Sequence, residues 1–260
     1  MVSSPAVPEG AGLKLDIDGA VATITLHRPE RRNAMTPSLW HGLAAIGDAL
    51  PAEVRVVVIR GDGPSFSAGI DLRLFTAEGI PGEELTSPAD PGFEEAVASY
   101  QAGYLWLRRP DIVSIAAVHG YAIGGGFQLA LACDLRVCAD DAIFCMKEPA
   151  LGLVPDLTGT KPLVDLVGLP RALEICLTAR NIDAAEAYRL GLAQLVVPAA
   201  ELDSAVTELT QALQRPAADT ARATKELLLG AGGRTLEAQS AAEIAIQARL
   251  QRARGSGASW

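Results

Sequence analysis

Two glycine-rich segments could bring backbone N–H groups close to a ligand. Residues 61–69 read GDGPSFSAG and residues 120–126 read GYAIGGG. Glycines between a strand and a helix allow close approach of the backbone, and a helix start offers unpaired N–H groups. Neither segment has the GxGxxG or GxxxxGKS/T spacing of a phosphate-binding turn. The remaining interpretation is a pair of donors for the oxyanion of an enolising thioester.

The first half of the chain should place both glycine turns at one sheet edge. Residues 13–26 alternate apolar and polar side chains across Asp18-Gly19, which predicts a β-hairpin. Thr36 could cap a helix running to about Leu50, and residues 54–60 form a β-branched run typical of a buried strand. A second such run, residues 112–118, precedes the second turn. If the two strands are parallel neighbours, their turns lie together.

The other expected elements follow from the spacing of apolar residues. Residues 76–91 collect Gly, Pro, Ser and acidic residues, which indicates a mobile surface loop that could act as a lid. Short strands are expected over 134–138 and 142–145. Helices are expected over 92–107, 125–133, 171–178 and 184–190, and over most of 201–254, including 217–230 and 236–251.

Length and composition favour a single α/β domain. The 260 residues are 49% hydrophobic, enough for one sizeable core. We expect a disordered leader over 1–12, a core over 13–200, a helical region over 201–254 and a disordered tail over 255–260. A net charge of −9 argues against nucleic-acid binding. The absence of a long apolar run or signal peptide predicts a cytoplasmic protein without membrane contact, and four cysteines without CxxC spacing do not indicate a metal.

Three motifs together resemble the signature of the crotonase (enoyl-CoA hydratase/isomerase) family. They are SFSAGIDL at 65–72, AVHGYAIGGGFQLA at 117–130 and ACDLR at 132–136, within a resemblance extending from His27 to at least Leu195. The resemblance implies a ββα spiral core, a C-terminal helical trimerisation region and a homotrimer or hexamer. It also implies an oxyanion hole made by the N–H groups of Ala68 and Gly125. The substrate would be an acyl-CoA thioester, with no other cofactor and no metal.

The same resemblance implies where coenzyme A binds. Arg28, Arg31 and Arg32 precede Asn33-Ala34, in the segment that receives the nucleotide in this family, although a solvated surface turn is the alternative. Asp71 could instead cap a helix or fix the loop. The full set of residues expected at the coenzyme is Arg28, Arg31, Asn33, Ala34, Ala68, Ile70, Asp71 and Leu72.

The resemblance also implies the catalytic positions: Glu148, Gln128 and Asp156. Glu148 falls on the second of the two glutamates used by hydratases, whereas Gln128 replaces the first, and an amide can orient water but cannot take its proton. Asp156 stands where dienoyl-CoA isomerases of the family have an aspartate. The alternatives are a structural ion pair for Glu148, a turn cap at Thr158-Gly159 for Asp156 and a satisfied helix amide for Gln128.

Isomerisation of a double bond needs only one carboxylate beside a stabilised enolate, so the sequence favours an isomerase with Glu148 as acid/base. The first alternative is a hydratase, a lyase of fatty acid metabolism, using Glu148 with Asp156 or a water held by Gln128. A non-catalytic acyl-CoA-binding protein is the alternative from another class. Acyl-chain length and pathway stay open.

Overall fold

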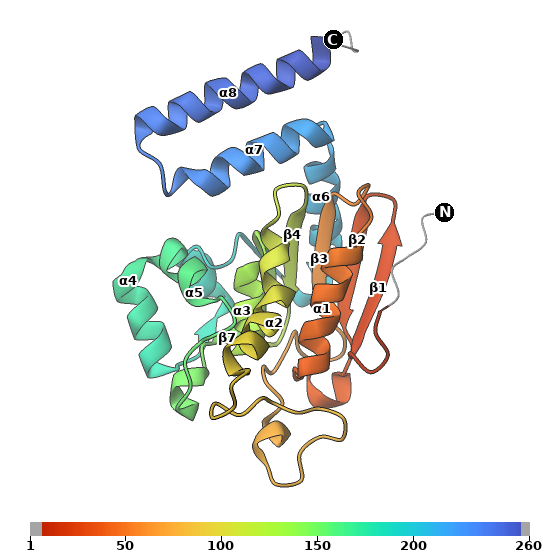
Figure 1. The fold of residues 1–260 in the computed structure, drawn as a ribbon, viewed down its shortest axis with the longest axis vertical. Coiled ribbons are helices and arrows are strands. Elements are labelled where there is room, and N and C mark those ends of the chain that lie inside the picture. The colour runs from red at the N-terminus through yellow and green to blue at the C-terminus, as the bar shows by residue number, and fades with distance from the viewer. Residues whose placement is uncertain (1–6, 256–260) are drawn as a thin grey trace.

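Two β-sheets form the centre of the computed structural model, which describes residues 7–255 (Figure 1). The larger sheet has the order β1-β2-β3-β4-β6-β9 and the smaller one β5-β7-β8. The strands are β1 (Leu13–Asp18), β2 (Val21–Leu26), β3 (Val56–Gly61), β4 (Val113–Val118), β5 (Tyr121–Ile123), β6 (Leu135–Ala139), β7 (Ile143–Cys145), β8 (Ile182–Asp183) and β9 (Leu195–Val197).

The predicted hairpin is confirmed, because β1 and β2 pair antiparallel from Leu13–Leu26 to Asp18–Val21. Strands β2, β3, β4, β6 and β9 are then parallel neighbours. Parallel strands need a crossover, and helices supply it. These are α1 (Pro37–Ala49), α2 (Phe93–Leu105), α3 (Gly125–Ala132), α4 (Thr160–Thr178) and α5 (Ala184–Arg189).

The chain repeats a strand-strand-helix unit, which agrees with the expected ββα spiral. β4 enters the large sheet, β5 enters the small one and α3 follows; β6, β7 and α4 repeat this order. Helix α4 begins eleven residues before its predicted start at Arg171 and has a kink at Gly168, where φ is 73°. Pro170 follows, and its missing N–H suits the kink.

The loop between β3 and α2 is tied to the core at its centre. Glu83 accepts a hydrogen bond from the Ser38 backbone N–H in the first turn of α1, at 3.0 Å. A carboxylate at a helix N-terminus is favoured by the helix dipole. Leu85 packs against the core. The loop around Glu83 therefore covers the N-terminal end of α1.

The expected leader and tail lie partly outside the described residues. Within the part that is described, Ala11 is buried and its N–H donates to the Pro8 carbonyl, so the leader becomes ordered before residue 13. The C-terminal helices are α6 (Leu202–Gln214), α7 (Ala218–Ala231) and α8 (Leu236–Gly255). Helix α8 lies along α7 at one end of the molecule, away from the sheets (Figure 1). Among the described helices, none is long and apolar enough to cross a membrane.

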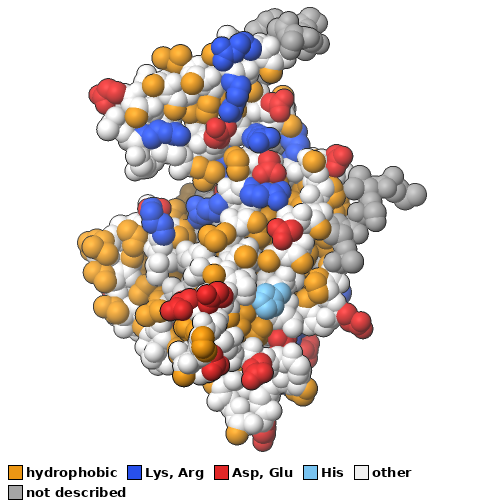
Figure 2. All heavy atoms as spheres, viewed as in Figure 1, with side chains coloured by type: hydrophobic (Ala, Val, Ile, Leu, Met, Phe, Trp, Pro, Cys, Tyr) orange, Lys and Arg blue, Asp and Glu red, His pale blue; other side chains and the backbone are white. Residues whose placement is uncertain are grey.

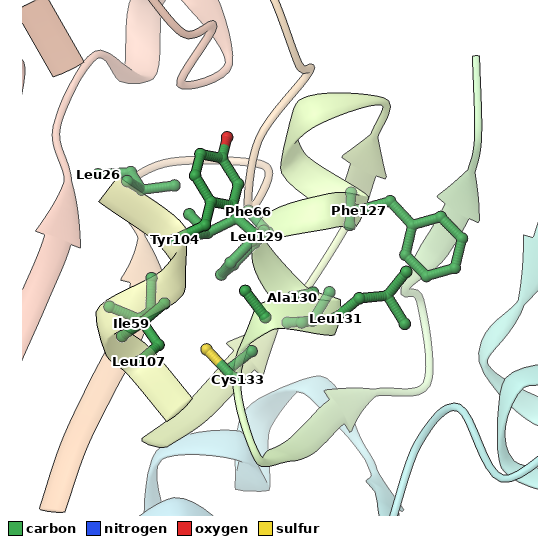
Figure 3. Close-up of a cluster of buried hydrophobic side chains, with 14 of the residues drawn as sticks. Leu26, Ile59, Phe66, Tyr104, Leu107, Phe127, Leu129, Ala130, Leu131 and Cys133 are labelled. Atoms are coloured by element: carbon green, nitrogen blue, oxygen red, sulfur yellow. The ribbon is translucent and has the colours of Figure 1, made fainter. Parts of the chain in front are cut away.

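The main core lies between the large sheet and the helices α1, α2 and α3. Figure 3 shows Leu26 and Ile59 from the sheet converging with Tyr104 and Leu107 from the α2 side and with Leu129 of α3. Every residue of α3 is buried. A helix that is apolar on all sides must be enclosed, so this packing fixes the start of α3, where the second glycine turn ends.

Candidate active site

The two glycine turns lie side by side, as expected for neighbouring parallel strands. The Ser67 N–H donates to the Tyr121 carbonyl at 2.8 Å, and the Ile123 N–H donates back to the Ser67 carbonyl at 3.0 Å. Gly69 has a φ of 82°, and a Cβ there would lie 2.5 Å from the Ile123 carbonyl oxygen. Only glycine permits this approach, which brings the peptide after Gly69 to the start of α3.

Gly125 supplies the first N–H of α3, which has no acceptor inside the helix. The second predicted donor, Ala68, requires a correction, because its N–H donates to the Arg32 carbonyl at 2.8 Å. Ile70, two residues on, is better placed. Its neighbours Gly69 and Asp71 bond to the Met35 backbone, so its own N–H points away from Met35 and has no acceptor among the described residues.

The start of α3 is enclosed by the side chains of Met35, Tyr104 and Leu157. A Cβ on Gly125 would lie 3.3 Å from Met35 Sδ and Leu157 Cδ1 and 3.6 Å from Tyr104 Oη. The Tyr104 hydroxyl accepts a hydrogen bond from Trp40 Nε1 at 3.1 Å. Burial raises the pKa of Tyr104. The sequence does not mark Tyr104 as a site residue, because its position in α2 has no signal beyond that of a core residue.

Glu148 and Gln128 are in direct contact, although twenty residues separate them. Gln128 Nε2 donates to Glu148 Oε1 at 2.7 Å, and Gln128 is completely buried. Glu148 is only 8% exposed, and its Oε2 is buried without a hydrogen-bond partner among the described residues. No salt bridge to Glu148 is present in this part of the chain, so the expected alternative of a structural ion pair is not observed.

Burial raises the pKa of Glu148, and the nearby Asp156 carboxylate adds to this effect. The Gln128 amide and the backbone N–H groups of Lys147 and Glu148 act in the opposite direction. The pKa of Asp156 is also raised by burial. A carboxyl group with a raised pKa can both take and return a proton near neutral pH.

Asp156 does not cap the turn at Thr158-Gly159. The Gly159 N–H donates instead to Gln128 Oε1 at 3.1 Å, together with the Leu157 N–H at 2.9 Å. The Asp156 backbone carbonyl is held by Gln101 Nε2 at 2.6 Å. Asp156 therefore belongs to a segment held by two glutamine amides, and its carboxyl group has no side-chain hydrogen-bond partner among the described residues.

Three residues expected at the coenzyme instead hold the loops together. The Arg28 guanidinium donates to Asp71 at 3.0 Å and to the Ala34 carbonyl. Asn33 is fully buried, and its Nδ2 donates to the carbonyls of Asp62 and Ser65 at 2.8 Å each. Asp71 caps the short helix Leu72–Phe75. The side chains of Arg28 and Asn33 are thus engaged in internal hydrogen bonds, and their contact with coenzyme A stays a prediction.

The ion pairs with Arg73 and Arg28 lower the pKa of Asp71 to about 2. The loop-fixing alternative therefore describes Asp71 well. Arg31 and Leu72 are exposed and Ala34 is buried, and the Arg32 guanidinium lies 5.9 Å from the centre of the Tyr121 ring. Arg31 and Arg32 are the cations of this segment that could still meet a phosphate.

An apolar cavity of about 420 Å³ lies between α4 and the segment that joins Glu148 to Asp156, and neither of these two residues is part of its lining. Pro149 and Pro155, the next residue after Glu148 and the one before Asp156, are part of its lining, with Leu163 and Cys176 of α4. Exposed leucines continue this surface along α4 (Figure 2). A larger cavity of about 520 Å³ lies between α7 and the sheet, at Lys225, and is lined by residues other than those of the Glu148 site.

Comparisons with known proteins place these features in one family. The family model described as enoyl-CoA hydratase/isomerase matches residues 16–257. A candidate enoyl-CoA hydratase from Thermobifida fusca YX, solved in complex with acetoacetyl-CoA, is 58% identical over 96% of this chain and 100% of its own, with a TM-score of 0.92.

Two curated relatives are named for different reactions. Carnitinyl-CoA dehydratase of Salmonella paratyphi A is 40% identical over 83% of this chain and 79% of its own length. The peroxisomal Delta(3,5)-Delta(2,4)-dienoyl-CoA isomerase of Arabidopsis thaliana is 31% identical over 84% of this chain and 80% of its own. The relatives therefore share chemistry on coenzyme A thioesters but not one reaction.

Proposed function

Because the chain belongs to the enoyl-CoA hydratase/isomerase (crotonase) family, and is thereby an enzyme of acyl-CoA chemistry, we propose that it moves a double bond within an enoyl-CoA thioester. The observation that carries this proposal is one buried carboxylate, Glu148, whose unpartnered Oε2 lies next to Gly124, the residue before the Gly125 N–H. The position that would hold a second acid is occupied by the amide of Gln128.

The proposed reaction requires no group other than Glu148 to move a proton. Glu148 Oε2 removes a proton from C2 of a 3-enoyl thioester, and the electron pair of that C–H bond shifts toward the thioester oxygen. The N–H groups of Gly125 and Ile70 stabilise the resulting oxyanion, a contribution of about 3 kcal/mol per donor in comparable sites. The proton then returns from Glu148 to C4, which leaves the conjugated 2-enoyl thioester.

The surroundings of the site support an aliphatic acyl-CoA as the substrate. The 420 Å³ cavity between α4 and the segment after Glu148 is lined by Pro, Leu, Val, Ala and Cys with Thr160 as its one hydroxyl residue, which suits a hydrocarbon chain. Exposed Arg31 and Arg32 could meet the phosphates of the coenzyme. The Thermobifida fusca relative was solved with acetoacetyl-CoA, which supports the same ligand class here.

Hydration is the second candidate, and the position of Asp156 supports it. Asp156 is close enough to raise the pKa of Glu148, and a second carboxyl group could supply the proton that hydration adds. The purified protein should be mixed separately with trans-3-enoyl-CoA and trans-2-enoyl-CoA of short and medium chain length. Conversion between these isomers without a mass change supports isomerisation, whereas addition of water to the 2-enoyl substrate would reject the single-carboxylate mechanism.

We also propose that the C-terminal helices mediate trimer formation. Leu228 and Leu229 on α7 and Leu236 and Ile244 on α8 are exposed in the single chain. Light scattering coupled to size-exclusion chromatography should give three or six times the 27.1 kDa of the chain. A monomer at micromolar concentration would contradict this assembly.

A further inference from the structure

The orientation of the Gln128 amide is determined by the backbone around it. Its Oε1 lies 2.9 Å from the Leu157 nitrogen and 3.1 Å from the Gly159 nitrogen. Both nitrogens carry hydrogen, so only the carbonyl oxygen of the amide can face them. The NH₂ group must therefore face Glu148 Oε1, at the observed 2.7 Å.

We infer that Gln128 is a positioning residue that holds Oε1 of Glu148 and thereby assigns proton transfer to Oε2. Oε1 of Glu148 accepts a 2.7 Å hydrogen bond from this fixed donor, whereas Oε2 has no partner among the described residues and is the oxygen left to take a proton. The assignment of proton transfer rests on the proposed function. The fixed contact between the two side chains does not.

Glutamine suits this position because it is a donor without charge. A glutamate in its place could still accept from Leu157 and Gly159, but its other oxygen would face Glu148 Oε1, and two carboxylates at that distance must share a proton. The other titratable groups around Glu148 are Asp156, Tyr104, Cys145 and Cys176, all anionic or neutral. Lys147 is exposed. The Gln128 amide is therefore the principal side-chain group that stabilises the Glu148 anion.

The test follows the titration of the Glu148 carboxyl group by its ¹³C chemical shift, in protein labelled at the glutamate side-chain carboxyl. The Glu148→Gln variant identifies the signal by its loss. Gln128→Met removes the donor at nearly constant size, and Gln128→Glu keeps the acceptor for both N–H groups, so that at least one variant should fold. Gln194→Glu is the matched control, since Gln194 also accepts from a backbone N–H, that of Arg136, and makes no contact with Glu148.

We expect the Glu148 midpoint to rise by about half a pH unit or more in Gln128→Met. In Gln128→Glu we expect two coupled steps, with the upper one at least about one unit above the wild-type midpoint. Gln194→Glu should leave the midpoint unchanged. A Glu148 midpoint within about 0.2 unit of wild type in either Gln128 variant that folds would overturn the inference.

A kinetic readout separates this inference from the proposed function. On the 3-enoyl-CoA that the wild-type enzyme isomerises, Gln128→Met should lower kcat at least about tenfold and leave KM within about twofold. If wild-type protein isomerises no enoyl-CoA but the carboxyl titration shifts as expected, the proposed function fails and the Gln128–Glu148 contact stands. If isomerisation depends on Glu148 but not on Gln128, only the positioning role fails.

Discussion

The α-carbon of Gly124 faces the carboxyl group of Glu148, and a Cβ at this position would lie 3.0 Å from Oε1. The same residue starts the peptide whose N–H belongs to Gly125, so one glycine sits between the proposed base and a proposed oxyanion donor. Its φ of 51° and ψ of −120° are open to glycine alone.

Gly124→Ala should therefore lower turnover by more than a loss of folded protein can explain. The new methyl group would push Glu148 aside and rotate the Gly125 N–H, for an expected loss of at least about 10²-fold in kcat. Gly191→Ala is the control, because Gly191 also has a positive φ, 76°, but has open space around it. Steady-state kinetics on both variants, with circular dichroism for folding, makes the comparison; equal effects on kcat would contradict the proposed arrangement.

Glu148→Gln should remove the proton acceptor without closing the site. We expect isomerase turnover to fall about 10²- to 10⁴-fold, while the dissociation constant for coenzyme A, measured by calorimetry, stays near the wild-type value. Glu208→Gln, on the exposed face of α6, is the control for loss of one negative charge. Substantial turnover in Glu148→Gln would show that another group moves the proton.

The pH profile of kcat/KM should show the raised pKa of Glu148. The base must be deprotonated in the free enzyme, so activity should fall as the pH decreases through a pKa above the ordinary 4.5. Below that pKa the rate should decrease tenfold per pH unit. A profile that stays flat down to pH 4.5 would argue against burial of the working base.

Asp71→Asn should weaken the loops beside the site at neutral pH. The folded-state pKa of Asp71, about 2 against 3.8 in the unfolded chain, means that its stabilisation is complete above pH 3.8 and is lost as the pH falls through about 2. That shift corresponds to about 2 kcal/mol of unfolding free energy. Urea unfolding of both proteins at pH 7 and pH 3 should show a smaller difference at the lower pH. Asp203→Asn, in an exposed pair with Arg60, should change stability little at either pH.

Lys225 links α7 to the large sheet through buried hydrogen bonds. Its Nζ donates to the Ile112 carbonyl at 2.7 Å and to Asp134 at 2.6 Å. Lys225→Met keeps the length of the side chain but leaves Asp134 without its cation, so the unfolding free energy should fall by about 2 kcal/mol. Lys161→Met removes an exposed pair with Asp165 and should cost less than about 0.5 kcal/mol. Similar losses in the two variants, measured by urea unfolding, would contradict the role of Lys225.

Much of the fold could be predicted from local patterns. The Thr36 cap of α1, the hairpin and the two parallel strands with their glycine turns are all confirmed, because capping and side-chain alternation act over a few residues. Local patterns did not predict features that depend on contacts between distant segments. Helix α4 extends across Gly168, and Ala11 is buried against Gly42 of α1, contacts that local spacing does not encode.

The sequence by itself determined the family and the candidate carboxyl groups, since both depend on residue types at fixed spacing. Only the tertiary structure decided how each polar group is used. The Ala68 N–H donates to the Arg32 carbonyl, whereas the Ile70 N–H has no acceptor among the described residues. The orientation of the Gln128 amide is fixed by the N–H groups of Leu157 and Gly159, about thirty residues away. The physical reason is that most buried donors and acceptors must be paired, and their partners come from remote segments that are brought together only by folding.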